Sequence, residues 1–364
     1  MTVTLQTHSS PQRTEQDWSP TIARQLFDGN QDILVKSGEE LDSLMKQAVA
    51  NKALARILPA TRGTSEILSR RLEDARIEQD KRLREALRLL EETQKICVEM
   101  NIPYAVMKSL DALPDLGHDI DLLVAQNVGK VRHELMKRIQ CNPVTLTFCD
   151  RQAGKFSTFI KGFTFDFELY AKISQLGEEY YSESRVLEHR IPEQIQRTRT
   201  FLCSHNDRLL ITCIHTMYRH GKIRLSDLNT AYSAFNKGVD YDTITRTAEF
   251  AGIQKGFTLF IRILETTAQN FLGRSIVPRK FHEYTTSVLA SDPLLSWTAT
   301  RLGQRFPLKL PIALNILLFL YKSATDLVRG RRSNWVRSLI APSILIIDKT
   351  VPLRLQKATA VRIW

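Results

Sequence analysis

The sequence lacks the features of several large protein classes. Its longest apolar stretches, 312–320 and 338–347, are interrupted by polar residues or proline. They fall short of the roughly 20 residues that a membrane span needs. The first 20 residues are polar and lack the basic-then-apolar order of a signal peptide. We therefore expect a cytoplasmic protein with no transmembrane segment.

Cysteine is scarce and unpatterned. An odd number is a poor basis for a disulfide framework, and there is neither a C-x-x-C pair nor a zinc-like spacing. We expect reduced thiols that pack mostly as small hydrophobic side chains. No paired base supports a catalytic thiol. The five cysteines are Cys97, Cys141, Cys149, Cys203 and Cys213.

Hydrophobic periodicity predicts the organisation of the chain, which has no internal repeat. Apolar residues recur at helical spacing over 41–58 and 65–100, short β-prone runs lie between 102 and 170, and the pattern beyond 175 is almost entirely helical. We expect an α+β fold whose small mixed sheet has four or five strands. The expected parts are a disordered leader (1–30), a helical N-terminal segment (31–100), the sheet core (101–175), a large helical substrate-side region (176–300) and a basic helical C-terminal region (301–364).

Positive charge is concentrated at the C-terminal end. The chain has a net charge of +12, and residues 301–364 hold twelve Lys or Arg against Asp326 and Asp348. Such a segment fits a polyanion contact with nucleic acid, anionic lipid or a phosphate-rich ligand, and Arg329-Gly-Arg-Arg332 is its densest cluster. The alternative is a solvated helical surface whose long side chains cover apolar neighbours.

The segment His118-Asp-Ile-Asp-Leu-Leu-Val124 is the most informative part of the sequence. Alternate residues of a strand point the same way, so Asp119 and Asp121 should project together from an otherwise buried strand. Two buried anions require either Lys or Arg partners or a divalent metal. Carboxylates suit Mg²⁺, which in phosphate-binding sites takes one or two of them. The pattern therefore favours phosphoryl or nucleotidyl transfer.

A second acidic strand is predicted in Phe163-Thr-Phe-Asp-Phe-Glu-Leu-Tyr170. Its alternation places Asp166 and Glu168 on one face and the phenylalanines on the other. If this strand lies beside the first one, the carboxylates converge and can hold two Mg²⁺ ions. Asp166 is the expected third ligand and can also accept the proton of an attacking hydroxyl, with Glu168 as the alternative.

Lys108 and Ser109 end the short predicted strand 102–107. The lysine offers a point charge to nucleotide phosphates, and the serine offers hydrogen bonds. The alternative is a strand-end lysine in solvent. A D-x-D also occurs in sugar-nucleotide glycosyltransferases, but those usually begin with a larger α/β domain. The chain's other D-x-D, Asp240 and Asp242, fits helix capping.

Taken in order, these segments resemble the nucleotidyltransferase superfamily with the polymerase-β-like core, and within it a large, little-characterised bacterial branch. The resemblance extends into a histidine-containing helix and the arginine-aspartate helix after it, and it covers residues 40 to 275. The segments that carry it are Ile102-Pro-Tyr-Ala-Val-Met-Lys-Ser109, Asp119-Ile-Asp-Leu-Leu-Val124, Phe165-Asp-Phe167, His215-Thr-Met-Tyr-Arg-His-Gly221 and Arg224-Leu-Ser-Asp227.

The resemblance implies a phosphorus-group transferase built on a nucleotidyltransferase core. Asp119, Asp121 and Asp166 would bind Mg²⁺ or Mn²⁺, and Lys108 with Ser109 would meet the nucleoside triphosphate. The enzyme would move a nucleoside monophosphate to an unknown acceptor and release pyrophosphate.

Two departures from the family pattern motivate an alternative function. Ser109 stands where the family commonly has glycine, and Gly117-His118 stands where an arginine often precedes the D-x-D. The alternative is a catalytically weak or inactive protein of the same fold that binds nucleic acid, a membrane surface or another protein.

The remaining polar candidates have simpler interpretations. His215 lies in an apolar helix and fits a hydrogen-bonded core residue better than a ligand. Arg219 is a weaker candidate for phosphate contact. Arg224 and Asp227, three residues apart, fit a pair on one helix.

Overall fold

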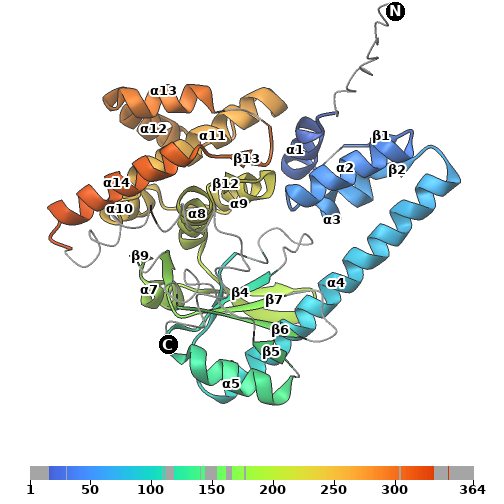
Figure 1. Cartoon of the computed structure of the whole chain (residues 1–364), viewed down its shortest axis with the longest axis horizontal. Helices are drawn as coiled ribbons and strands as arrows, with labels where there is room; N and C mark the ends of the chain where they lie inside the picture. Colours follow the sequence, from blue (N-terminus) through green and yellow to red (C-terminus); the bar gives the residue numbers. More distant parts are fainter. Residues whose placement is uncertain are drawn as a thin grey trace, which may run out of the picture.

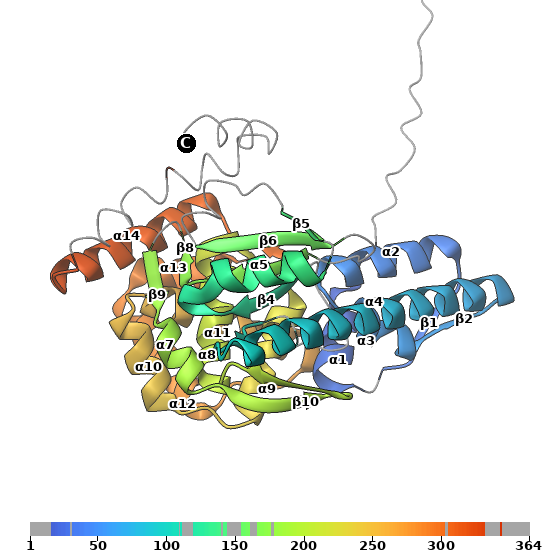
Figure 2. The ribbon, with the colours of Figure 1, turned by 90° about the horizontal axis from the view of Figure 1, so that it is seen from below.

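The computed structural model describes residues 16–29, 31–108, 110, 119–139, 141–143, 154–160, 166–175, 178–302, 305–331 and 343. A mixed sheet of seven strands lies between two layers of helices (Figures 1 and 2). Helices α4 and α5 cover one face, and α8 with the other C-terminal helices covers the second. This arrangement agrees with the expected α+β class.

The N-terminal part contains a helix that the sequence did not predict. α1 (Ser19–Asp28) buries Ile22 and Phe27, and Trp18 just before it is buried as well. Pro20 lies in the first turn, where its missing N–H costs nothing. Arg24 Nε donates to the Phe271 carbonyl at 2.9 Å, which ties α1 to a C-terminal helix. The expectation of a disordered leader is therefore wrong over 19–28.

The helices expected over 41–58 and 65–100 are confirmed. Ser37 and Ser65 act as N-caps, because their hydroxyls accept from the backbone N–H groups of Glu40 and Leu68. The first half of the long helix packs against the N-terminal helices and the second half against the sheet. The elements are β1 (Ile33–Val35), α2 (Gly38–Ala50), α3 (Leu54–Ile57), the 3-10 turn η1 (Leu58–Ala60), β2 (Thr61–Gly63) and α4 (Glu66–Glu99).

The central sheet is mixed, as expected, but larger. Its strand order is β10-β11-β3-β4-β7-β6-β5, in which β4 and β7 run parallel while β3 and β6 run antiparallel to their neighbours β4 and β7. The strands are β3 (Ala105–Val106), β4 (Asp119–Leu123), β5 (Cys141–Pro143), β6 (Lys155–Ile160), β7 (Asp166–Tyr170), β10 (Ile191–Ile195) and β11 (Thr198–Leu202).

The expectation of an almost entirely helical chain beyond residue 175 is wrong over 178–202. Strands β10 and β11 extend the central sheet past the expected core boundary, and β8 (Ile173–Gln175) pairs with β9 (Glu178–Tyr181) in a separate hairpin. β10 is an edge strand, where Pro192 is tolerated because the ladder needs no donor on its outer side.

The two faces of the central strands follow the alternation predicted from the sequence. Ile120, Leu122 and Phe167 pack toward α4 and α5 (Val128–Arg138), whereas Leu123 and Tyr170 pack toward the C-terminal helices. Asn127 precedes α5 but makes no side-chain capping hydrogen bond.

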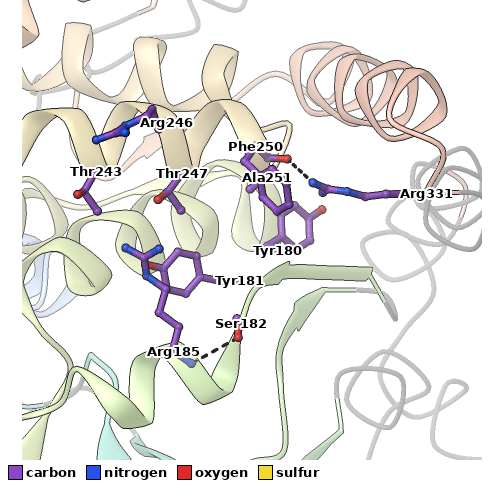
Figure 3. A pocket seen from close by; sticks show the side chains of 10 residues that line it. All are labelled: Tyr180, Tyr181, Ser182, Arg185, Thr243, Arg246, Thr247, Phe250, Ala251 and Arg331. Carbon is purple, nitrogen blue, oxygen red and sulfur yellow. Dashed lines mark hydrogen bonds between the residues drawn. The ribbon is translucent and has the colours of Figure 1, made fainter.

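The second helical layer begins with α8 (His205–Cys213). It continues as the π-helix η3 (Ile214–His220) and ends at Gly221, whose φ of 56° is the left-handed conformation expected there. Helices α7 and α10 border a pocket (Figure 3). The other elements are α7 (Glu183–Glu188), β12 (Lys222–Ile223), α9 (Leu225–Asn236), α10 (Tyr241–Phe250), α11 (Gln254–Leu272), α12 (Arg279–Ser291), α13 (Pro293–Arg301), β13 (Leu308–Lys309) and α14 (Ile312–Val328).

Several sequence expectations lie outside the described residues. These include Ser109, the Gly117-His118 pair and parts of the β-prone stretch between 102 and 170. In the part of the chain that the structure describes, no helix is both long and apolar enough to cross a bilayer.

Candidate functional site

Three carboxylates meet where β4 and β7 run side by side. The parallel register places Asp119 opposite Asp166 and Asp121 opposite Glu168. Carboxylate oxygens of Asp119, Asp121 and Glu168 lie within 4.8 Å of one another. Asp121 is 1% exposed and Glu168 is 7% exposed. The sequence prediction that the two acidic strands converge is therefore confirmed for these three residues.

The third carboxylate of this cluster is Glu168. Asp166 lies two residues before Glu168 on β7, and its backbone pairs with that of Asp119. The side chain of Asp166 lies outside what the structure describes. Its expected role as a ligand stays a prediction.

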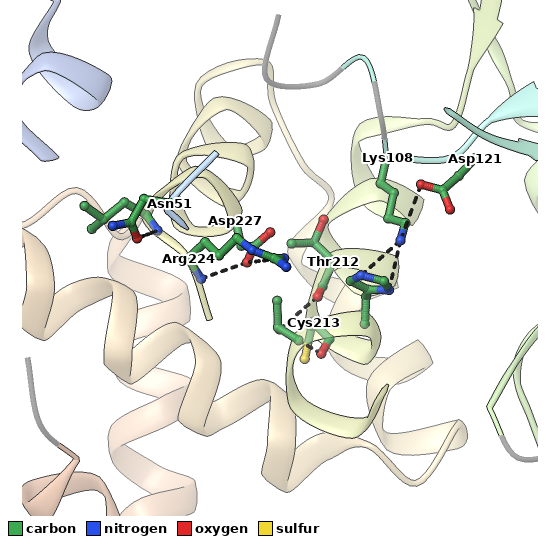
Figure 4. Close-up of polar contacts among 10 residues, drawn as sticks. Asn51, Lys108, Asp121, Thr212, Cys213, Arg224 and Asp227 are labelled. Carbon is green, nitrogen blue, oxygen red and sulfur yellow. Dashed lines mark hydrogen bonds and ion pairs between the residues drawn. The ribbon is translucent and has the colours of Figure 1, made fainter. Parts of the chain in front are cut away.

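Lys108 reaches the cluster from the end of β3. Its Nζ lies 3.4 Å from Asp121 Oδ2 (Figure 4). The same Nζ lies 3.0 Å from His215 Nε2 and 3.1 Å from Nδ1. Only 15% of the Lys108 side chain is exposed, so it is not the strand-end lysine in solvent that the sequence left open.

Glu168 is held by a second set of polar partners. Lys155, on β6, forms an ion pair with Glu168 Oε1. The Tyr170 hydroxyl donates to Glu168 Oε2 at 2.7 Å, and Arg219 Nη1 donates to that hydroxyl at 2.8 Å. The cluster is therefore surrounded by Lys108, Lys155 and Arg219, as expected for buried anions.

The charged neighbours act unequally on the two buried carboxyls. Burial disfavours the charged form of Asp121, but the positive charges of Lys108 and Arg219 outweigh it and hold the pKa of Asp121 well below its usual range. Burial, together with the charges of Asp121 and Asp119, raises the pKa of Glu168 to about 7. One carboxyl is thus firmly ionised at neutral pH, and the other titrates there.

The basic side of the site shows the complementary effects. Burial lowers the pKa of Lys108, although Asp121 and Asp119 favour its charged form. Burial and the charge of Lys108 hold the pKa of His215 well below its ordinary value. A neutral imidazole has one nitrogen that accepts a hydrogen bond, so His215 can accept from the Lys108 ammonium.

His215 is hydrogen-bonded inside the protein, as the sequence indicated, and Arg219 lies beside the carboxylate cluster. Both lie on the π-helix η3, whose widened turns occur frequently at functional sites. Lys155 and Tyr170 were missed altogether. Lys155 and Tyr170 lie opposite each other in the register of β6 and β7. The sequence alone did not define this register, which is what would have identified them.

The other candidate residues have structural roles, as expected. Arg224 lies 3.9 Å from Asp227, whose carboxylate also accepts from the Arg224 backbone N–H at 2.8 Å (Figure 4). Asp240 caps α10 by accepting from Thr243 N at 3.1 Å. Arg329 Nη1 donates to the Glu249 carbonyl at 2.7 Å, so at least this residue of the basic cluster helps to pack the chain.

Three of the five cysteines, Cys97, Cys203 and Cys213, are buried thiols. Burial raises the pKa of Cys97 to about 12. These thiols are therefore inert packing residues, as the sequence indicated.

The donor set of the cluster fits a divalent cation. Carboxylate oxygens are hard ligands that suit Mg²⁺ and Mn²⁺. A cation bound to Asp119, Asp121 and Glu168 would replace the compensation that the neighbouring ammonium groups now supply. Such a site could hold and polarise a phosphate-bearing substrate.

Comparison of the chain with protein families, with curated proteins and with solved structures finds no match. The arrangement of the cluster, rather than a relative, therefore carries the functional argument.

Proposed function

We propose that the protein is a Mg²⁺- or Mn²⁺-dependent nucleotidyltransferase. It would transfer a nucleoside monophosphate from a nucleoside triphosphate to an acceptor hydroxyl, phosphate or amine and release pyrophosphate. The supporting observation is the meeting of Asp119, Asp121 and Glu168 on two parallel strands, with Lys108 Nζ 3.4 Å from one of them. This combination of carboxylates and lysine suits a metal-bound triphosphate.

In this proposal Asp119, Asp121 and Glu168 hold the metal, with Asp166 as a further candidate ligand. A bound divalent ion supplies charge neutralisation for the attacking and leaving oxygens. Lys108 supplies a positive charge to the phosphates when the metal takes its place beside Asp121. His215 accepts a hydrogen bond from Lys108 and keeps the ammonium at the edge of the cluster.

Glu168 is the strongest candidate among the described residues for moving a proton. In the metal-free site the pKa of Glu168 is raised to about 7, so this carboxyl can exchange a proton near neutral pH. A cation bound to Glu168 would favour its ionised form, so Glu168 serves as the proton acceptor only where Asp119 and Asp121 hold the metal without it. Tyr170 and Arg219 orient its second oxygen. On the resemblance alone, Asp166 is the alternative acceptor.

The test is transfer of label from each of the four nucleoside triphosphates to RNA, protein and small-molecule acceptors, with Mg²⁺ or Mn²⁺. Asp119→Ala with Asp121→Ala should abolish transfer. The matched control removes the chain's other D-x-D, by Asp240→Ala with Asp242→Ala, and should retain activity. Equal transfer by the wild type and the D119A/D121A variant would refute the proposal.

One observation favours a second function. Lys108 and Lys155 already contact carboxylates of the cluster, so the cluster is charge-compensated by the protein itself. A protein of this kind can be a metal-independent binding or regulatory protein whose working surface is the basic C-terminal region. α14 packs into the core through Leu318 and Phe319, so a truncation that tests this must spare it.

The test of this second function compares the full chain with a chain ending at residue 331 in titrations against RNA and against anionic vesicles. Binding that is lost on truncation supports it. Binding that survives truncation unchanged argues against it.

A further inference from the structure

A second cavity lies away from the carboxylate cluster and shares no lining residue with it. It has a volume of about 700 Å³ and lies between the β9–α7 segment, α10 and the C-terminal end of α14 (Figure 3). Its size is within the usual range of small-molecule sites. The lining residues are Tyr180, Tyr181, Ser182, Arg185, Thr243, Arg246, Thr247, Phe250, Ala251 and Arg331.

The charge of this cavity is one-sided. Among the residues that the structure describes, its lining includes Arg185, Arg246 and Arg331 but no Asp or Glu. The three arginines come from three separate parts of the chain, α7, α10 and the segment after α14, so no helical charge stripe explains their meeting. Figure 3 shows Arg185 and Arg246 on opposite walls. The concentration of positive charge in a concave space favours an anionic ligand.

Two of the arginines keep donors available. Arg185 Nε is buried and has no hydrogen-bond partner among the described residues. In the same part of the chain, Arg246 is hydrogen-bonded through Nε, to the Asp242 carbonyl at 3.0 Å, and its side chain is otherwise exposed. An anion placed between the two guanidinium groups would be attracted by both positive charges, although the buried Nε itself faces away from solvent.

Arg331 has a different role at the cavity wall. Its Nη2 donates to the Phe250 carbonyl at 2.8 Å, and its Nη1 lies 3.3 Å from Asp326 Oδ1. Asp326 also pairs with the fully buried Lys322 at 2.5 Å. One carboxylate is thus shared by two cations, which leaves this wall with a net positive charge. These contacts hold Arg331 in place, and its charge adds to the positive electrostatic potential of the cavity.

We infer that this cavity binds a small phosphate-bearing molecule of about the size of a nucleotide. The planar guanidinium groups of Arg185 and Arg246 match the oxygens of a phosphate. The Thr247 hydroxyl, on the same helix as Arg246, adds a further donor. A small molecule fits better than a nucleic-acid strand, because the charge is gathered in one open pocket and does not run along an extended surface stripe. The inference does not rest on the proposed transferase activity.

The test is calorimetric titration of the full chain in EDTA with pyrophosphate, ATP, inorganic phosphate and a single-stranded oligonucleotide. Removing divalent ions separates this cavity from the carboxylate cluster. The wild type should bind pyrophosphate or ATP at one site per chain. Arg185→Gln with Arg246→Gln should weaken that binding roughly tenfold or more, because each lost charged hydrogen bond is worth about that factor.

Three control variants make the result specific. Arg62→Gln with Arg279→Gln removes the same charge from exposed positions, 74% and 90% exposed, and should bind as the wild type does. Arg185→Lys with Arg246→Lys keeps the charge and should retain part of the binding. Asp119→Ala with Asp121→Ala should bind normally, which separates a failure here from a failure of the proposed function.

Four results would overturn the inference. These are no binding of any phosphate compound by the wild type, unchanged binding by R185Q/R246Q, loss of binding in D119A/D121A, or a clear preference for the oligonucleotide over the small phosphates. Equal melting temperatures of the R185Q/R246Q variant and the wild type show that any loss is local.

Discussion

The ammonium group of Lys108 lies 3.4 Å from Oδ2 of Asp121, and only 1% of the Asp121 side chain is exposed. A divalent cation that binds this carboxylate must compete with the lysine for the same oxygens. His215, with its nearer nitrogen 3.0 Å from Nζ, offers the lysine an alternative partner. Metal binding and the position of Lys108 are therefore coupled.

Replacing Lys108 by methionine should make the fold dependent on metal. Without divalent ions the variant leaves the buried Asp121 with less positive charge around it, chiefly that of Arg219, so we expect a loss of about 3 kcal/mol in the free energy of unfolding. Mg²⁺ should recover much of this loss, and nucleotide affinity should fall. Denaturant titrations in EDTA and in Mg²⁺ measure both effects.

The control for this experiment is Lys95→Met. Lys95 pairs with Glu91 and Glu92 on the surface, so its replacement should have little effect in either condition. A K108M variant whose lost stability is not recovered by Mg²⁺ would show that the cluster does not exchange the lysine for a metal.

Glu168 should make stability depend on pH near neutrality. Its folded-state pKa is raised to about 7 from an ordinary value of 4.5. Its contribution is therefore fully present below pH 4.5 and is lost as pH rises through 7. In EDTA, the difference in melting temperature between Glu168→Gln and the wild type should grow in favour of the variant from pH 5 to pH 8. A difference that is constant with pH would contradict this assignment.

Tyr170→Phe removes the hydroxyl that connects Arg219 to Glu168. The loss of a buried donor between two charged groups should cost about 1–3 kcal/mol in the free energy of unfolding. It should also weaken metal binding, because Glu168 loses its orienting partner. Tyr321→Phe is the control, since that hydroxyl donates to Asp292 at 3.3 Å away from the site. Equal metal affinity of Y170F and the wild type would exclude the orienting role.

The N-terminal helix α1 should contribute to stability. Ile22 is fully buried, so Ile22→Ala should lower the free energy of unfolding by about 2–5 kcal/mol. Leu34→Ala, at a position 54% exposed, is the matched control and should cost much less. Similar small losses for both would mean that α1 does not dock in solution.

Apolar periodicity predicted the helices well because each helix buries one apolar face in the core on its side of the sheet. It failed for α1, where Pro20 looked like a break although proline is accepted in a first turn. It also failed for β10, because an edge strand with exposed polar residues lacks a strong apolar pattern. It failed for β11 because two of its buried positions are threonines, Thr198 and Thr200, and because its partner β3 lies far away in the sequence.

The candidate site was only partly predictable for a related reason. Strand alternation is local, so it correctly placed Asp119 and Asp121 on one face and Glu168 on the matching face of its own strand. The partners Lys155 and Arg219 come from strand register and helix docking. Strand register and helix docking are set by tertiary packing, and no local pattern in the sequence defines them.

Binding of Mn²⁺ together with a non-hydrolysable nucleoside triphosphate, followed by electron paramagnetic resonance, tests the central claim most directly. The wild type should bind the ion with the nucleotide, Asp121→Asn should lose most of this binding, and Asp240→Asn should keep it. Equal Mn²⁺ binding by the wild type and D121N would contradict a metal site at the carboxylate cluster.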